Sequence, residues 1–133
     1  MNYMEAVVLN GSYYVPLIIA NPFNGKTFPE NGSNVLALID SGFDGFILIN
    51  KQTYYKLGLN QLKPREITIK GICCVVKALK YPIRLLLPDL NLSVDGEAIY
   101  YEKNPEILVG TEFLSNLKIK INGCKESITL DNC

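Results

Sequence analysis

The sequence contains no histidine among its 133 residues, and this absence excludes several kinds of catalytic site. Ser–His–Asp and Cys–His nucleophiles both need an imidazole as general base, so this chain alone cannot build them. The usual zinc sites are also excluded, because the four cysteines form no Cys-x-x-Cys pair that could replace the histidines. Hydrolytic chemistry would therefore have to rest on carboxylates, lysine, tyrosine or an external metal.

The chain also lacks an excess of charge of either sign and a long hydrophobic run. Thirteen basic residues balance thirteen acidic ones, and the lysines are scattered, which argues against nucleic acid as a partner. No apolar stretch approaches the length needed to span a bilayer. The first residues, Met1–Glu5, show neither the basic nor the apolar region of a secretory signal. We therefore expect a soluble cytoplasmic protein with no membrane partner.

Cysteines are few, at Cys73, Cys74, Cys124 and Cys133. Because free cysteine often packs as a small hydrophobic residue, we expect buried structural thiols, although the neighbouring Cys73 and Cys74 would point to opposite faces of a strand, one buried and one exposed. A disulfide between Cys124 and Cys133 is left open, since pairing depends on geometry. A redox function for Cys73 and Cys74 is the weakest hypothesis, because adjacent cysteines on a strand are poorly placed to pair.

The length suits a single domain, residues 1–133, and the pattern is one of short strands separated by turns. This pattern predicts a mainly β fold, a barrel or sandwich with one or two short helices. The predicted strands cover residues 6–9, 13–20, 35–39, 46–49, 66–70, 72–79, 83–87, 92–101, 106–109, 117–121 and 127–130.

Turn and cap residues mark the connections between these strands. Asn10-Gly11 predicts a tight hairpin, and residues 21–34 form a loop rich in Asn, Gly and Pro. Asn50 can cap a short helix that runs through Leu57 and ends at Gly58. A bend is expected at Pro88, because proline cannot donate to a strand ladder.

The most informative motif is Asp40-Ser41-Gly42, which stands between two apolar strands, residues 35–39 and 46–49. This placement puts a carboxylate on a tight turn at the edge of a hydrophobic sheet. Taken alone, the tripeptide is most simply a turn, because all three residue types favour turns. A weak echo occurs later, where Ile107-Leu108-Val109-Gly110 is followed by a short predicted helix over residues 111–116.

Considered together, these features resemble the retropepsin-like aspartic proteases, and most closely their small prokaryotic forms. The resemblance rests on the run Asp40-Ser41-Gly42-Phe43-Asp44-Gly45-Phe46, on Leu57-Gly58-Leu59, and on the later Leu108-Val109-Gly110 unit. It implies a closed acid-protease β barrel with one half-site per chain. Because the chain carries one such motif, the resemblance implies a homodimer with a single active site on its two-fold axis.

The resemblance also implies a role for each residue of the motif. Asp40 from each subunit would form a carboxyl pair that activates water to hydrolyse a peptide bond, without cofactor or metal. Ser41 would fix the carboxylates by bridging the two loops, and Gly42 would let the substrate backbone approach. Asp44 would hydrogen-bond the main chain of the substrate, although capping its own loop is equally consistent with the sequence. Gly110 would lie beneath the Asp40 loop in a structural role.

The resemblance further implies that the hairpin around Gly71 is a flap that closes over an extended polypeptide substrate, with Gly71 and Ile72 in contact with it. This hairpin departs from glycine-rich viral flaps. Residues 21–34 are an addition that could line the cleft. Ile39, Ile47 and Ile72 are candidates for apolar substrate pockets, although core packing explains the first two more simply.

Two features leave other hypotheses open. The altered flap allows a non-catalytic alternative, a dimeric peptide-binding or assembly module with the same fold. The paired tyrosines, residues 13–14, 54–55 and 100–101, could form an aromatic binding face, but packing in the barrel or a dimer contact accounts for them better.

Overall fold

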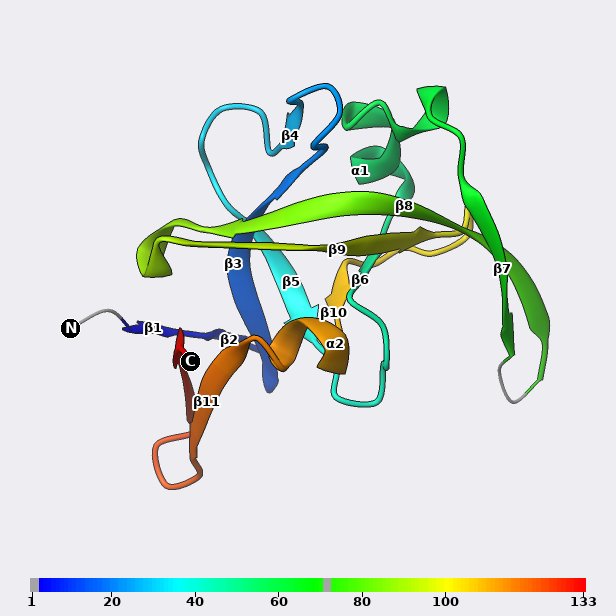
Figure 1. The fold of residues 1–133 in the computed structure, drawn as a ribbon. Coiled ribbons are helices and arrows are strands. Elements are labelled where there is room, and N and C mark those ends of the chain that lie inside the picture. Colours follow the sequence, from blue (N-terminus) through cyan, green and yellow to red (C-terminus); the bar gives the residue numbers. More distant parts are fainter. Residues whose placement is uncertain (1–2, 71–72) are drawn as a thin grey trace.

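The computed structural model describes residues 3–70 and 73–133, and its fold is mainly β with two short α-helices (Figure 1). The strands are β1 (Tyr3–Glu5), β2 (Val7–Leu9), β3 (Ser12–Ala20), β4 (Thr27–Phe28), β5 (Val35–Ile39), β6 (Ile47–Ile49), β7 (Arg65–Lys70), β8 (Val75–Leu87), β9 (Leu92–Tyr100), β10 (Leu108–Val109), β11 (Leu117–Asn122) and β12 (Ser127–Asn132). The helices are α1 (Lys51–Lys56) and α2 (Thr111–Leu114), with short 3₁₀ turns η1 (Leu59–Gln61) and η2 (Pro88–Leu90).

The larger sheet closes on itself into a ring in the order β3, β5, β10, β6, β9 and β8. Pairing between the end of β3 and the end of β8, with Ile19 opposite Leu85, completes the ring. The main core includes Ile19, Ile47 and Val109, none of which is exposed to solvent. The predicted mainly β fold with one or two short helices is confirmed, with a ring-like sheet at its centre.

A second, smaller sheet joins the two ends of the described chain in the order β1, β12 and β11. Its apolar face packs on the main core through Met4 in β1 and Leu130 in β12. Its other face is polar and borders a broad groove of about 450 Å³ that includes Lys118, Lys120 and Asp131. Since strands alternate their faces, this sheet covers one side of the core while keeping charged residues in water.

The hairpin turn and the helix caps that the sequence predicted are present at the predicted residues. Asn10 and Gly11 both have positive φ, 51° and 79°, as the two central residues of a tight β-hairpin require. The side chain of Asn50 accepts a hydrogen bond from the Thr53 N–H at 3.0 Å and so caps α1. Gly58 follows this helix in the left-handed conformation, with φ of 69°.

The strand β8 is longer than the sequence pattern suggests, because it runs without interruption through Pro82. On one edge, β8 pairs with β9 along most of its length. On its other edge, pairing with β7 ends at Lys80 and pairing with β3 begins at Arg84. Pro82 falls in the gap between them, where its missing N–H breaks no ladder bond on that edge. The bend predicted at Pro88 is present as η2.

The predicted loop Asn21–Asn34 does not line the region around Asp40, so that hypothesis is wrong. The loop contains β4, which pairs with the last two residues of β3. The Asn21 and Asn24 amides donate to the Leu57 carbonyl at 2.9 and 3.1 Å and tie the loop to the end of α1. Figure 1 places β4 and α1 at the opposite end of the molecule from the connection between β5 and β6.

The prediction of buried cysteines is also wrong. Cys73 and Cys74 are both exposed and are disulfide-bonded to each other, although the sequence argued against their pairing. Cys124 and Cys133 are exposed free thiols. They lie at opposite ends of the hairpin made by β11 and β12, and the six-residue length of β12, about 20 Å, separates them. A disulfide needs Cα atoms within about 7 Å, so these two cannot pair within the chain.

Among the described residues, no helix is long and apolar enough to cross a membrane.

Candidate active site

Asp40 lies directly after β5, on a four-residue turn. Its N–H donates to the Val109 carbonyl at 3.0 Å, so the pairing of β5 with β10 continues up to the carboxylate-bearing residue. The Phe43 N–H then donates to the Asp40 carbonyl at 3.1 Å and closes the turn over Ser41 and Gly42. The sheet therefore holds the Asp40 backbone in place while the turn keeps its side chain only partly buried.

The Asp40 carboxylate is oriented by its own chain. The Gly42 N–H donates to Asp40 Oδ1 at 2.9 Å, as Asp side chains do in turns. A Cβ on Gly42 would stand only 3.3 Å from the same oxygen, which is a tight contact. Glycine at this position therefore gives the carboxylate an N–H partner without crowding it.

The strand β10 passes between the two strands that flank this loop. It pairs parallel with β5, where Val109 is opposite Ile39, and antiparallel with β6, where Val109 is opposite Ile47. Gly110 follows β10 directly and donates its N–H to the Phe46 carbonyl at 3.1 Å. The Asp40 loop and the chain after β10 thus cross at close range, as the resemblance implied for Gly110.

The start of α2 is bonded to the Asp40 loop. The Thr111 N–H donates to the Phe43 carbonyl at 2.9 Å, and the Glu112 N–H donates to the Gly45 carbonyl at 3.3 Å. The first N–H groups of a helix have no partner within the helix, so the loop carbonyls supply the bonds that the short helix lacks. This arrangement fixes the loop against the crossing segment.

Gly110 leaves no room for a side chain at this crossing. A Cβ on Gly110 would collide with the backbone carbonyl oxygens of Phe43 and Gly45. Because both contacts are with backbone atoms, the clash could not be relieved by a change of rotamer. The structural role expected for Gly110 beneath the Asp40 loop is therefore explained by the packing.

A second apolar cluster links the Asp40 loop to the β7–β8 hairpin. Its buried members are Leu48, Ala78 and Ile99, and it is bordered by half-buried hydrophobic side chains at Phe43, Ile67, Ile69, Tyr101 and Leu108. These residues come from five neighbouring strands, from the Asp40 loop and from the segment after β9. The cluster therefore forms an apolar surface between the loop and one face of the hairpin.

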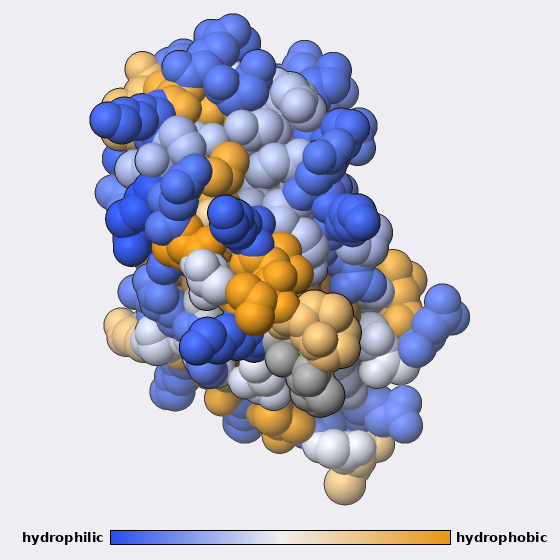
Figure 2. Space-filling model, turned by 90° about the vertical axis from the view of Figure 1, so that its right-hand side faces the viewer, coloured by the Kyte–Doolittle hydropathy of each residue, from blue (hydrophilic) through white to orange (hydrophobic). Residues whose placement is uncertain are grey.

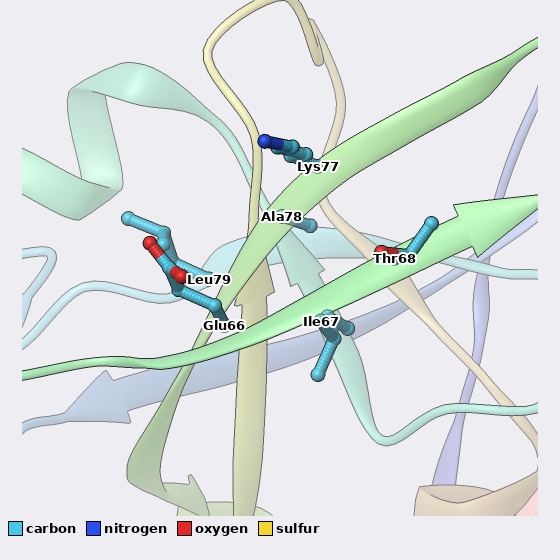
Figure 3. Close-up of a pocket in the computed structure, with 6 residues that line it drawn as sticks. All are labelled: Glu66, Ile67, Thr68, Lys77, Ala78 and Leu79. Atoms are coloured by element: carbon cyan, nitrogen blue, oxygen red, sulfur yellow. The ribbon is translucent and has the colours of Figure 1, made fainter.

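The two faces of the hairpin differ in chemistry. On the inner face, Ile67 is paired with Ala78, and both belong to the second apolar cluster. On the outer face, Thr68 is paired with Lys77 beside a shallow hollow of about 150 Å³. Figure 3 shows Ile67 and Lys77 pointing in opposite directions from the two strands. The hairpin thus turns an apolar side toward the cluster and a polar side toward solvent.

The other residues named from the sequence fall into two groups. Ser41, Gly42 and Asp44 are exposed on the same loop as Asp40. Gly71 and Ile72 lie outside the described residues, although the strands on both sides of them form the predicted hairpin.

Ile39 and Ile47 take the core positions that the sequence favoured over substrate pockets. Ile47 is completely buried in the main core, and Ile39 packs against that core. Their neighbours Leu38 and Leu48 face the other side, because a shift of one residue along a strand reverses its face. Sequence reasoning therefore missed Leu48, together with Phe43 and Leu108. The strand alternation was the available signal, but it could not say which face belonged to the core.

Within residues 3–70 and 73–133, no group of three or more Cys, Asp or Glu side chains is placed to hold a metal ion.

Comparison with known proteins places this geometry among retropepsin-like folds. The chain is 32% identical over 127 residues to a protein from Archaeoglobus fulgidus described as uncharacterized, a match covering 94% of this chain and 98% of that protein. No family model matches the chain.

Two solved structures share the fold. One is a retropepsin-like aspartic protease from Rickettsia conorii, with a TM-score of 0.68 and 18% identity over 96% of this chain and 89% of that chain. The other is EIAV protease in complex with an inhibitor, with a TM-score of 0.51 and 16% identity over 82% of this chain and 92% of that chain. At these identities the similarity establishes the fold.

Proposed function

We propose that this chain, which belongs to the same family as the Archaeoglobus fulgidus protein and has the retropepsin-like fold, is a homodimeric aspartic endopeptidase. The observation that carries the proposal is the position of Asp40. Its carboxylate is partly exposed at the end of a buried sheet, on a turn that is held by Val109 and Gly42.

A second Asp40, from a partner copy of the chain, would complete the site. Two carboxylates a few ångströms apart cannot both ionise cheaply, so they share a proton. The ionised carboxylate removes a proton from water, and the protonated one polarises the scissile carbonyl. This mechanism needs neither histidine nor a covalent intermediate, which suits a chain without histidine.

Other residues of the loop would then assist the pair. The Gly42 N–H already donates to Oδ1 of Asp40, so one carboxylate oxygen has its partner before a substrate arrives. The Ser41 hydroxyl is exposed on the loop and could bridge to the partner loop across the two-fold axis. Asp44 is exposed two residues after Gly42 and could accept a hydrogen bond from the main chain of an extended peptide. The β7–β8 hairpin, with Gly71 and Ile72 at its end, would close over that peptide.

Replacement of Asp40 by Asn tests the mechanism. The wild type and Asp40→Asn are assayed with a mixed peptide library between about pH 3 and about pH 7, the range in which carboxyl pairs act. We expect hydrolysis by the wild type and a loss of at least about a thousandfold in the variant, because an amide cannot act as the base. Hydrolysis that survives the substitution would rule out this mechanism. Asp89→Asn, an exposed change in η2, serves as the matched control.

Peptide binding without turnover at any pH in this range would favour the alternative, a dimeric peptide-binding or assembly module with the same fold.

A further inference from the structure

Phe43 follows the Asp40 turn, and its ring lies in a slot formed by two glycines. A Cβ on Gly45 would stand 2.8 Å from ring atom Cε1, and a Cβ on Gly110 would stand 2.6 Å from ring atom Cδ2. Real Cβ atoms essentially never approach other heavy atoms below 3.0 Å. The ring can therefore occupy this position only because both neighbours are glycine.

The backbone on both sides of this ring is also fixed. The Phe43 N–H donates to the Asp40 carbonyl at 3.1 Å, and the Phe43 carbonyl accepts from the Thr111 N–H at 2.9 Å. One bond ties the residue to the turn that carries Asp40, and the other ties it to the start of α2. The ring is thus held at a set position relative to the Asp40 carboxylate.

The half-buried ring extends the second apolar cluster up to the Asp40 loop. Ile99 Cδ1 stands 3.2 Å from the point where a Gly45 Cβ would be, so Ile99 and the Phe43 ring both lie close to Gly45. Ile67 and Ile69, on the inner face of the hairpin, border the same cluster. Figure 2 shows apolar side chains gathered within a mostly polar surface on the side of the molecule that carries the hairpin.

We propose that Phe43 is a specificity-determining residue whose ring limits the size of the substrate side chain next to the cleaved bond. The proposal rests on the function proposed above. Side chains of an extended peptide alternate, so a peptide bond presented to Asp40 places one flanking side chain toward the cluster between loop and hairpin. Because the fixed ring fills part of that space, the preferred side chain there is small and apolar, such as that of alanine.

Paired peptides test this size limit. The two peptides differ only at the residues that flank the cleaved bond. Both flanking residues are Ala in one peptide and Phe in the other. We expect the wild type to prefer Ala, and Phe43→Ala to shift the ratio of the two kcat/KM values toward Phe by at least about tenfold, the usual effect of small changes in an apolar pocket. An unchanged ratio in a folded Phe43→Ala protein would overturn the proposal.

Two further variants make this result decisive. Phe23→Ala removes the same ring from an exposed position in the loop between β3 and β4, where the side chain is 66% exposed, and should leave the ratio unchanged. An equal shift in Phe23→Ala would contradict a specific role for Phe43. Phe43→Leu keeps an apolar side chain in the slot and should shift the ratio less than Phe43→Ala. If thermal melting shows that Phe43→Ala does not fold, Phe43→Leu takes its place. A shift of the ratio toward Phe in Phe43→Leu then supports the proposal, and an unchanged ratio overturns it.

Binding measurements separate this inference from the proposed activity. Hydroxyethylene peptide analogues carrying either a methyl or a benzyl group at the position next to the uncleavable bond are titrated by calorimetry. Tighter binding of the methyl analogue by the wild type, reversed in Phe43→Ala, supports the size limit even where no peptide is cleaved. Equal binding of both analogues by the wild type overturns the size limit while cleavage stands. Absence of binding to either analogue overturns both proposals.

Discussion

At the scale of single residues, Tyr54 of α1 meets two tyrosines that are distant from it in sequence, Tyr81 and Tyr100. The Tyr54 and Tyr81 hydroxyls are hydrogen-bonded at 3.0 Å, and the Tyr54 ring stacks on Tyr100 with centroids 3.8 Å apart. All three side chains are buried. These contacts bear out core packing for Tyr54 and Tyr100: the buried Tyr54 hydroxyl has the partner it needs in Tyr81, and the Tyr100 ring is buried against Tyr54.

We predict that Tyr81→Phe destabilises the protein by about 1–3 kcal/mol, because it leaves the buried Tyr54 hydroxyl without its partner. The free energy of unfolding is measured in urea. Tyr55→Phe is the matched control, since the Tyr55 side chain is 53% exposed, and it should change stability by less than about 0.5 kcal/mol. Equal losses in the two variants would contradict the importance of the hydroxyl pair.

The same residues predict a loss of stability in alkali. Burial, and for Tyr81 also the hydrogen bond to Tyr54, raises the pKa of Tyr81 and of Tyr100 above the usual tyrosine value. A raised pKa in the folded state means that the stabilisation is complete below the unfolded value of about 10 and declines as the pH rises above it. We therefore expect the free energy of unfolding to fall above about pH 10, and to fall less steeply in Tyr81→Phe. Parallel curves for the two proteins would contradict this assignment.

At the scale of secondary-structure elements, the crossing of β10 with the Asp40 loop is the tightest part of the site. The N–H groups of Gly110, Thr111 and Glu112 all donate to carbonyls of that loop. Since α2 spans only Thr111–Leu114, its position depends on these bonds and on Phe113, which packs edge-on against Phe46 at a centroid distance of 5.7 Å. The loop that holds Asp40 and the segment after β10 therefore form one packed unit.

Gly110→Ala should disrupt this unit. The added Cβ would collide with two backbone carbonyls, so we expect a loss of at least about 3 kcal/mol in stability, at or above the usual cost of overpacking. Gly123→Ala is the matched control, because nothing lies within 4 Å of a Cβ at that position. Thermal melting of the two variants gives the comparison. A melting temperature for Gly110→Ala as high as that of the control would show that the crossing is not tightly packed.

At the scale of the whole molecule, one chain contributes one Asp40 turn. Under the proposed mechanism the active site is complete only when two copies associate around a two-fold axis. Sedimentation of the wild type at micromolar concentration should then give about twice the chain mass of 14.9 kDa. A protein that remains monomeric under conditions in which it cleaves peptides would contradict the shared site.

Mixing subunits tests the shared site directly. Wild-type chains are allowed to exchange with Asp40→Asn chains at a fixed total concentration. Because a mixed dimer has only one carboxyl, we expect the activity to fall faster than the wild-type fraction. A strictly linear fall would mean that each chain works alone. Addition of Asp89→Asn chains, which should retain Asp40 function, controls for effects of mixing.

The local parts of the structure that the sequence predicted are encoded by neighbouring residues, whereas the position of Gly110 was expected from the family resemblance. The Asp40 turn and the cap of α1 by Asn50 depend on contacts between residues two or three positions apart. The parts that it missed depend on residues far apart in the chain. The slot of Phe43 is formed by nearby Gly45 and distant Gly110, and nothing in the sequence around residue 43 indicates the contact with Gly110.

The sequence by itself determined the mainly β fold, the turn that presents Asp40 and the exclusion of histidine-dependent chemistry, because these follow from local patterns and composition. Only the tertiary structure decided which face of each strand belongs to the core. It buried Ile47 and turned Leu48 toward the hairpin. The physical reason is that the alternation of side chains along a strand defines two faces but does not show which of them is buried. Packing between distant segments decides which face belongs to the core.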